Sequence, residues 1–92
     1  MKNKKLEIIR KKLDILDNKF LLLVKKRTNL VNQVLLTKEF KNQIVDKRRI
    51  KKILSNIKIK SQKRKIDIKI TREIWKSMIR AYIKYEYRNF KK

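Results

Sequence analysis

The sequence predicts an all-α fold of three helices with a very long first helix, assembled as an intertwined helical homodimer. The 92 residues include no Gly and no Pro, the residues that most often mark turns and break helices. A helical pattern of apolar residues also runs from Leu6 to Lys38 without a turn signal inside it. A chain of this length forms one modest core, so residues 1–92 are predicted to be a single helical domain.

The first predicted helix carries a long apolar seam. Its apolar residues recur at steps of three and four, as in a helix that packs against a partner. The members of the seam are Leu6, Ile9, Leu13, Leu16, Phe20, Leu23, Leu30 and Val34. Arg27 interrupts the seam where an apolar residue is due, and a second row beside it begins at Arg10 and ends at Lys38.

The length of this helix favours a second copy of the chain as its partner. From Leu6 to Lys38 it would span roughly 50 Å at about 1.5 Å per residue. A compact domain of this size has a radius of gyration of only about 12 Å. The projecting part of the seam therefore needs a partner, and the simplest one is a second chain packed antiparallel in a two-fold dimer.

Two further helices are predicted after a polar stretch at Glu39–Gln43. The second helix begins at Asp46, whose carboxylate can cap the N-terminus. Its apolar face consists of Ile50, Ile53, Leu54 and Ile57. The run Lys58–Lys65 is polar and basic, and it is predicted to be a loop.

The third helix carries a charged residue on its apolar face. Residues 66–70 alternate Ile with charged side chains as in a strand, but a lone strand has no partner, so they are assigned to the helix entry. Either Thr71 or Asp67 can cap this helix. Its apolar face consists of Trp75, Met78, Ile79, Tyr82, Ile83 and Phe90. Glu86 falls on the same face.

The composition excludes several kinds of chemistry. The chain has no Cys and no His, which rules out a disulfide framework, a Cys/His zinc site and a Cys or His nucleophile. No apolar run is long enough to span a bilayer, and no cleavage site follows the basic residues 1–5, so a cytoplasmic protein is expected. The formal net charge of +22 favours anionic partners. An AT-rich coding sequence would also produce this excess of Lys, Ile and Asn, so only cations on apolar faces are informative.

Four charged residues fall where burial is expected. They are Arg10, Arg27, Lys38 and Glu86, and Arg49 at the start of the second helix is a fifth candidate. A buried charge is costly unless it is paired. One interpretation is therefore a structural salt bridge, for instance between Arg27 and Glu86, or long side chains that reach solvent from the edge of the seam.

The other interpretation is a pair of cationic pockets formed between two chains. Arg10 and Lys38 lie about 42 Å apart along one helix, so they cannot share a ligand within one chain. In an antiparallel dimer, Arg10 of one chain approaches the region from Arg27 to Lys38 of the other. Such a pocket suits a small dianion, because arginine binds carboxylates through two hydrogen bonds.

The order and spacing of these residues resemble the AroQ-type chorismate mutases over nearly the whole chain, from Leu6 to Phe90. The first helix of that family carries an arginine, an I/L-D-x-I/L-D step, a second arginine and a lysine. The second helix opens with V-x-D-x-x-R, of which this chain keeps the D-x-x-R spacing at Asp46 and Arg49, and the third carries I-W-x-x-M-I and ends with Gln or Glu. The matching positions are Arg10, Leu13–Asp17, Arg27, Lys38, Val45–Arg49 and Ile74–Glu86.

The resemblance implies a site for the dianion chorismate, which is converted to prephenate in aromatic amino-acid biosynthesis. The reaction is a pericyclic rearrangement that needs no cofactor and no metal. Arg27 and the partner subunit's Arg10 would hold the two carboxylates. Lys38 and Glu86 would contact the ether oxygen of the substrate from two sides.

The remaining positions of the resemblance leave a second activity open. Arg49 would line the pocket near the ring, and Asp46 would hold the mouth of the site. Ile50 stands where many mutases have Glu, and the pocket residue Tyr82 stands where many have Ser. Both features also occur in isochorismate pyruvate lyases of the same fold. Those lyases have Gln in place of Glu86, so the mutase is favoured and the lyase is the alternative.

Two other classes of protein are compatible with the charge. Net charge alone favours a helical nucleic-acid-binding protein, but the basic residues are spread over all three helices and the aromatic residues lie mainly on apolar faces. A membrane-surface helix would leave Asp14, Asp17 and the matched spacing of Arg and Lys without a role. The sequence therefore predicts neither a specific nucleic-acid partner nor a membrane partner.

Overall fold

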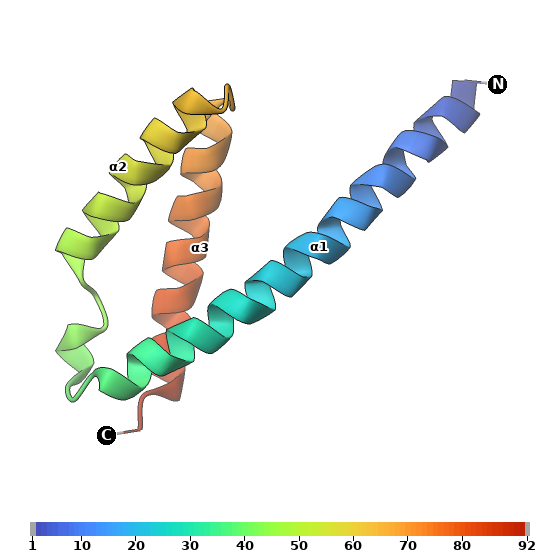
Figure 1. Ribbon diagram of the computed structural model, residues 1–92. Coiled ribbons are helices and arrows are strands. Elements are labelled where there is room, and N and C mark those ends of the chain that lie inside the picture. The colour runs from blue at the N-terminus through green and yellow to red at the C-terminus, as the bar shows by residue number, and fades with distance from the viewer. Residues whose placement is uncertain (1, 92) are drawn as a thin grey trace. The chain divides into compact units, whose positions relative to one another are not determined.

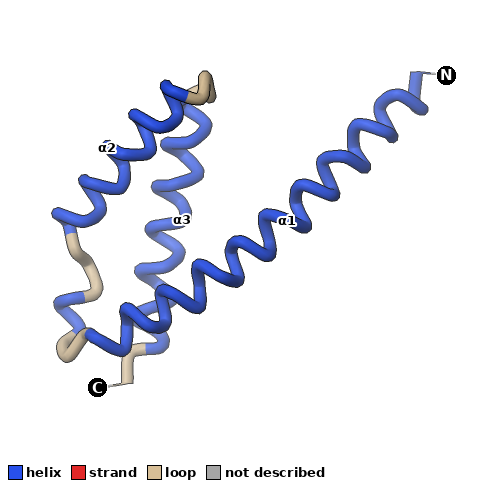
Figure 2. Tube along the Cα trace, in the orientation of Figure 1, coloured by secondary structure: helices blue, strands red, loops and turns tan. Residues whose placement is uncertain are grey.

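The computed structural model describes residues 2–91, and its regular structure there is entirely helical. Figure 1 shows the order α1 (Lys2–Thr37), a short 3-10 helix η1 (Lys41–Gln43), α2 (Lys47–Lys63) and α3 (Ile68–Asn89). Over the described residues, Figure 2 contains helix and loop but no strand. With 36 residues, α1 is much longer than α2 with 17 and α3 with 22. The predicted all-α fold with a very long first helix is confirmed.

The chain divides into two compact units, Met1–Gln33 and Val34–Lys92. The first unit consists of α1 alone, and the second holds the end of α1, η1 and the hairpin of α2 and α3. None of the helices within residues 2–91 combines the length and the apolar content that a membrane span requires.

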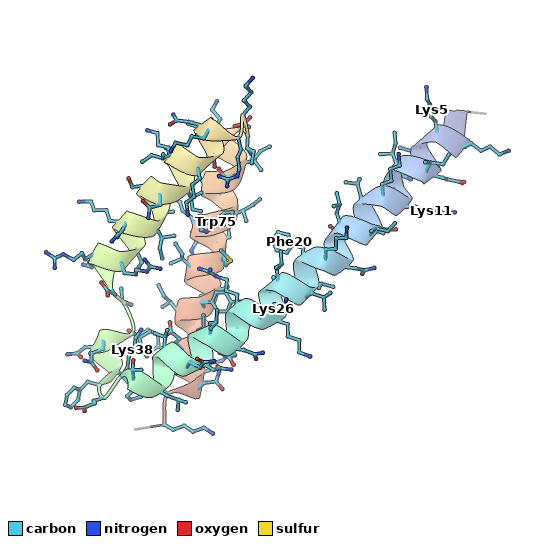
Figure 3. The ribbon with its side chains drawn as sticks, viewed as in Figure 1. Lys5, Lys11, Phe20, Lys26, Lys38 and Trp75 are labelled. Atoms are coloured by element: carbon cyan, nitrogen blue, oxygen red, sulfur yellow. The ribbon has the colours of Figure 1, made fainter. Side chains whose placement is uncertain are left out.

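Most apolar side chains of the first unit are exposed. The exposed ones range from 44% at Leu6 to 66% at Leu21, while Val24 and Val31 are half-buried. Figure 3 shows Phe20 projecting from the middle of α1, where it is 53% exposed. The helix begins at Lys2, earlier than the predicted Leu6, because the preceding residues include good helix formers and no helix breaker.

In the second unit, α2 packs against α3 along their apolar faces. The side chain of Asp46 accepts a hydrogen bond from the backbone N–H of Arg49 at 3.0 Å, which confirms the predicted cap of α2. The cap of α3 is Asp67, which accepts from the backbone N–H of Lys69 at 2.8 Å. Thr71 therefore lies inside α3, where it is buried.

The predicted loop at Lys58–Lys65 is wrong, because α2 continues to Lys63. Ser61 occupies a position on the buried side of α2 where an apolar residue would have signalled a helix. Its hydroxyl lies 2.6 Å from the carbonyl oxygen of Ile57 and 2.8 Å from the hydroxyl of Thr71. This buried polar pair allows the helix to continue against α3 without an apolar side chain at that point.

The end of α2 is a tight turn without glycine. The N–H of Ile66 donates to the carbonyl of Ser61 at 2.9 Å, and the N–H of Lys65 donates to the carbonyl of Gln62 at 3.2 Å. These two bonds form a Schellman motif, which needs a left-handed residue just after the helix. Lys65 supplies it with a φ of 55°.

Candidate active site

The candidate site is centred on an ion pair between Lys38, which directly follows α1, and Glu86 of α3. The ammonium group of Lys38 lies 3.1 Å from Oε1 of Glu86. The side chains are 16% and 9% exposed, so the pair is largely withdrawn from water. A charge-assisted hydrogen bond in such surroundings is stronger than one on the surface.

The connection between α1 and α2 holds Lys38 in place. Its Nζ also donates to the carbonyl oxygen of Ile44 at 3.3 Å, and Ile44 is only 3% exposed. Oε1 of Gln43 accepts hydrogen bonds from the backbone N–H groups of Glu39 at 2.7 Å and of Phe40 at 2.9 Å. The two bonds to Gln43 close the turn. The ammonium group of Lys38 is thus held by the side chain of Glu86 and by the backbone carbonyl of Ile44.

An open cavity of about 650 Å³ lies beside this lysine. Its lining consists of Thr37, Lys38, Gln43, Val45, Asp46 and Lys47. Figure 3 shows Lys38 at this connection, beyond the end of α1. The volume falls within the range of about 300–1,000 Å³ typical of small-molecule sites. Lys38, whose ammonium group is held in place, is therefore part of the wall of a space of ligand size.

Comparison with protein families matches residues 9–87 to chorismate mutase type II. The chain belongs to this family. The match covers all of α2 and most of α1 and α3, so the predicted resemblance is confirmed and the chain is an enzyme of the chorismate mutase kind. Comparisons with curated proteins and with solved structures gave no match.

The second unit of this chorismate mutase family protein holds five of the seven predicted site residues. Lys38 and Glu86 are in contact, and Asp46 lines the same cavity as Lys38. Tyr82 is half-buried on α3, one turn before Glu86. Its ring lies edge-on to that of Tyr85, with 6.4 Å between the ring centroids. Arg49 is exposed in the first turn of α2.

Arg10 and Arg27 lie on α1 in the first unit. Arg27 is half-buried and Arg10 is exposed. The expected contact of Arg10 with a substrate carboxylate depends on a second chain, and the contacts of both arginines stay predictions.

Sequence reasoning missed two features of the site. It did not predict the ion pair between Lys38 and Glu86. It also missed the carbonyl of Ile44, since a backbone acceptor leaves no mark in the sequence. Within residues 2–91, no group of three or more acidic side chains is placed to hold a metal ion.

Proposed function

We propose that the protein is a chorismate mutase that converts chorismate to prephenate, with Lys38 as its main catalytic residue. An ammonium group has three N–H donors. The bonds of Lys38 to Glu86 at 3.1 Å and to Ile44 at 3.3 Å use two of them and leave one. A held lysine with one remaining donor beside a cavity is the observation that carries the proposal.

The reaction requires few other functional groups from the protein. The rearrangement breaks a C–O bond and forms a C–C bond within one molecule, so it requires no nucleophile and no external proton. Negative charge develops on the ether oxygen as the C–O bond breaks. A fixed ammonium group stabilises that charge more in the transition state than in the ground state, which is the condition for faster turnover.

The rest of the proposed site holds the substrate in its reactive shape. Arg27 and the partner subunit's Arg10 bind the two carboxylates, and the compact diaxial conformer is thereby selected. This arrangement requires a homodimer. The exposed apolar seam of α1 supports that assembly, because the first unit contains no other element that could cover it.

Glu86 has a second role in this proposal. The ether oxygen is an acceptor, so only the protonated carboxyl of Glu86 can donate a hydrogen bond to it. In the structure the group instead accepts a bond from Lys38. We propose that chorismate enters beside this pair and that turnover uses the protonated form.

A direct assay tests the proposed activity. The purified protein is mixed with chorismate, and the loss of ultraviolet absorbance is followed while prephenate, which has the same mass as chorismate, is identified by its acid conversion to phenylpyruvate. Conversion by the wild type and its loss in Lys38→Ala support the proposal. No conversion by the folded dimer would overturn it.

The alternative activity is tested in the same experiment. Ile50 and Tyr82 are the two positions that favour an isochorismate pyruvate lyase. Isochorismate is supplied in a parallel reaction, and salicylate is detected by its fluorescence. Formation of salicylate without turnover of chorismate would assign the lyase.

A further inference from the structure

A second hollow lies in the α2–α3 hairpin. Its volume is about 340 Å³, and it shares no lining residue with the cavity beside Lys38. Its lining comes from residues 54–58 of α2 and residues 68–76 of α3, next to the turn that joins the two helices. The volume lies at the lower end of the range for small-molecule sites, about 300–1,000 Å³.

The lining combines an apolar floor with hydroxyl groups. Leu54, Ile57 and Ile68 are half-buried and form the apolar part. The hydroxyls are those of Ser55, which is exposed, and Thr71, which is buried. This combination suits a ligand with a compact hydrocarbon body and a polar end.

The rim carries three cations and no acid. Lys58 comes from α2, and Arg72 and Lys76 come from α3. None of the eight lining residues is Asp or Glu. Because Arg72 and Lys76 are four residues apart on one helix, their like charges destabilise the helix slightly, and Lys58 adds a third positive charge. A bound anion would relieve this repulsion.

We propose that this hollow binds a small carboxylate with an apolar body, such as an aryl-alkyl carboxylate. The carboxylate lies against Arg72 and Lys76, since arginine favours bidentate contacts with carboxylates, and the hydrocarbon lies on the apolar floor. A zwitterionic amino acid fits less well, because its ammonium group would be repelled by the three cations and no acidic side chain lines the hollow to pair with it. The proposal is independent of the activity assigned to Lys38, which uses the other cavity.

The test titrates the full-length protein with 3-phenylpropionate at low salt and follows the side-chain methyl signals by NMR. The largest shifts are expected at Ile57, Ile68 and Thr71. L-Phenylalanine has the same apolar body with an added ammonium group, and it should bind at least about tenfold more weakly. Equal affinity for the two compounds would contradict the proposal, as would shifts confined to residues around Lys38.

A matched pair of double variants separates a site from general attraction to a basic surface. Arg72→Gln/Lys76→Gln removes two cations from the hollow, whereas Arg80→Gln/Lys84→Gln removes two exposed cations at the same spacing on the same helix outside it. The first variant should bind 3-phenylpropionate at least about tenfold more weakly, and the second should change affinity less than about twofold. Equal losses would mean surface attraction only.

A second pair keeps the proposal testable if the first double variant does not fold. Lys58→Gln removes the cation that α2 contributes, and Lys51→Gln removes an exposed cation of α2 outside the hollow. Only Lys58→Gln should weaken binding. An unchanged affinity in Lys58→Gln would overturn the proposal.

Discussion

At the scale of single residues, the ammonium group of Lys38 is held by groups of its own chain before any substrate arrives. Glu86 and the carbonyl of Ile44 fix its direction, so little reorganisation is needed when charge develops on a bound molecule. The same contact couples function to stability, because removing the lysine leaves the carboxylate of Glu86 buried.

The first prediction concerns the cations of the proposed site. Lys38→Ala and Arg27→Ala should each lower turnover by about 10²–10³-fold, the usual effect of losing one preorganised electrostatic contact. Steady-state kinetics with chorismate give the measurement. Lys25→Ala and Lys26→Ala change exposed residues of α1 and should leave turnover nearly unchanged. Near-normal turnover in Lys38→Ala would place the site elsewhere.

The fold of these variants requires its own control. Lys38→Ala should reduce the free energy of unfolding by about 1–3 kcal/mol, because Glu86 keeps a buried charge without its ammonium partner. Adding Glu86→Gln to Lys38→Ala removes that charge and should restore much of the stability without restoring turnover. Activity and stability are thus separated within one pair of positions.

The second prediction concerns pH. If protonated Glu86 donates to the ether oxygen, catalytic efficiency should rise as the pH falls, until the fold or the substrate fails. Glu86→Gln donates at every pH, so its profile should be flatter and its activity should persist at neutral and alkaline pH. Efficiency is measured against pH for both proteins. Parallel profiles, or a glutamine variant that is inactive throughout, would leave Glu86 with a structural role only.

The third prediction concerns the turn after α2. Lys65 has a φ of 55°, a region that costs a residue with a side chain roughly 1–2 kcal/mol and costs glycine almost nothing. Lys65→Gly should therefore raise the free energy of unfolding by about 0.5–1 kcal/mol after the extra chain entropy of glycine is counted. Urea denaturation at fixed protein concentration measures the change. Lys63→Gly, inside α2, is the control and should destabilise the protein.

At the scale of helices, the contact between Ser61 and Thr71 joins α2 to α3. The fourth prediction is that Ser61→Ala lowers the free energy of unfolding by about 1–2 kcal/mol, because it leaves the buried hydroxyl of Thr71 without this partner. Thr71→Val should lower it by a similar amount, and the double variant should lower it by less than the sum of the two single effects. Urea titrations of the four proteins complete the cycle. Additive effects of the two substitutions would mean that the hydroxyls do not stabilise each other. As a control, Ser77→Ala changes an exposed serine of α3 and should leave the free energy of unfolding nearly unchanged.

The helices themselves could largely be predicted from the sequence, because periodicity and capping are local. The spacing of the apolar residues predicted the extent of α1, and the carboxylate of Asp46 predicted the start of α2, each to within a few residues. The second half of α2 could not be predicted in the same way. The buried role of Ser61 depends on Thr71 in another helix, and no pattern within residues 58–65 contains that information.

The site shows the same division between local and distant information. Lys38 and Glu86 could be identified because each places a charge on or beside an apolar face. Their pairing could not, since it depends on the path of the chain between α1 and α2 and on the carbonyl of Ile44. The predicted place of Arg10 in the site depends on a second chain.

At the scale of the whole molecule, the fifth prediction is a homodimer. Most apolar residues of α1 in the first unit are 44–66% exposed and need a partner. Analytical ultracentrifugation at micromolar concentration should give about twice the chain mass of 11.4 kDa. Leu16→Lys, on the seam, should weaken the dimer and abolish activity, whereas Asn18→Lys adds the same charge on another side of α1 and should do neither. An active monomer would contradict the dimer and the shared site.

The closeness in sequence of Ser61 and Thr71 has a consequence for the order of folding. They are ten residues apart, so the α2–α3 hairpin closes only a short loop and can form on the microsecond scale before chains meet. The chain has no proline, and prolyl isomerisation cannot delay it. In the proposed homodimer, a slow phase of refolding would therefore belong to the encounter of two chains, and its rate would report their assembly.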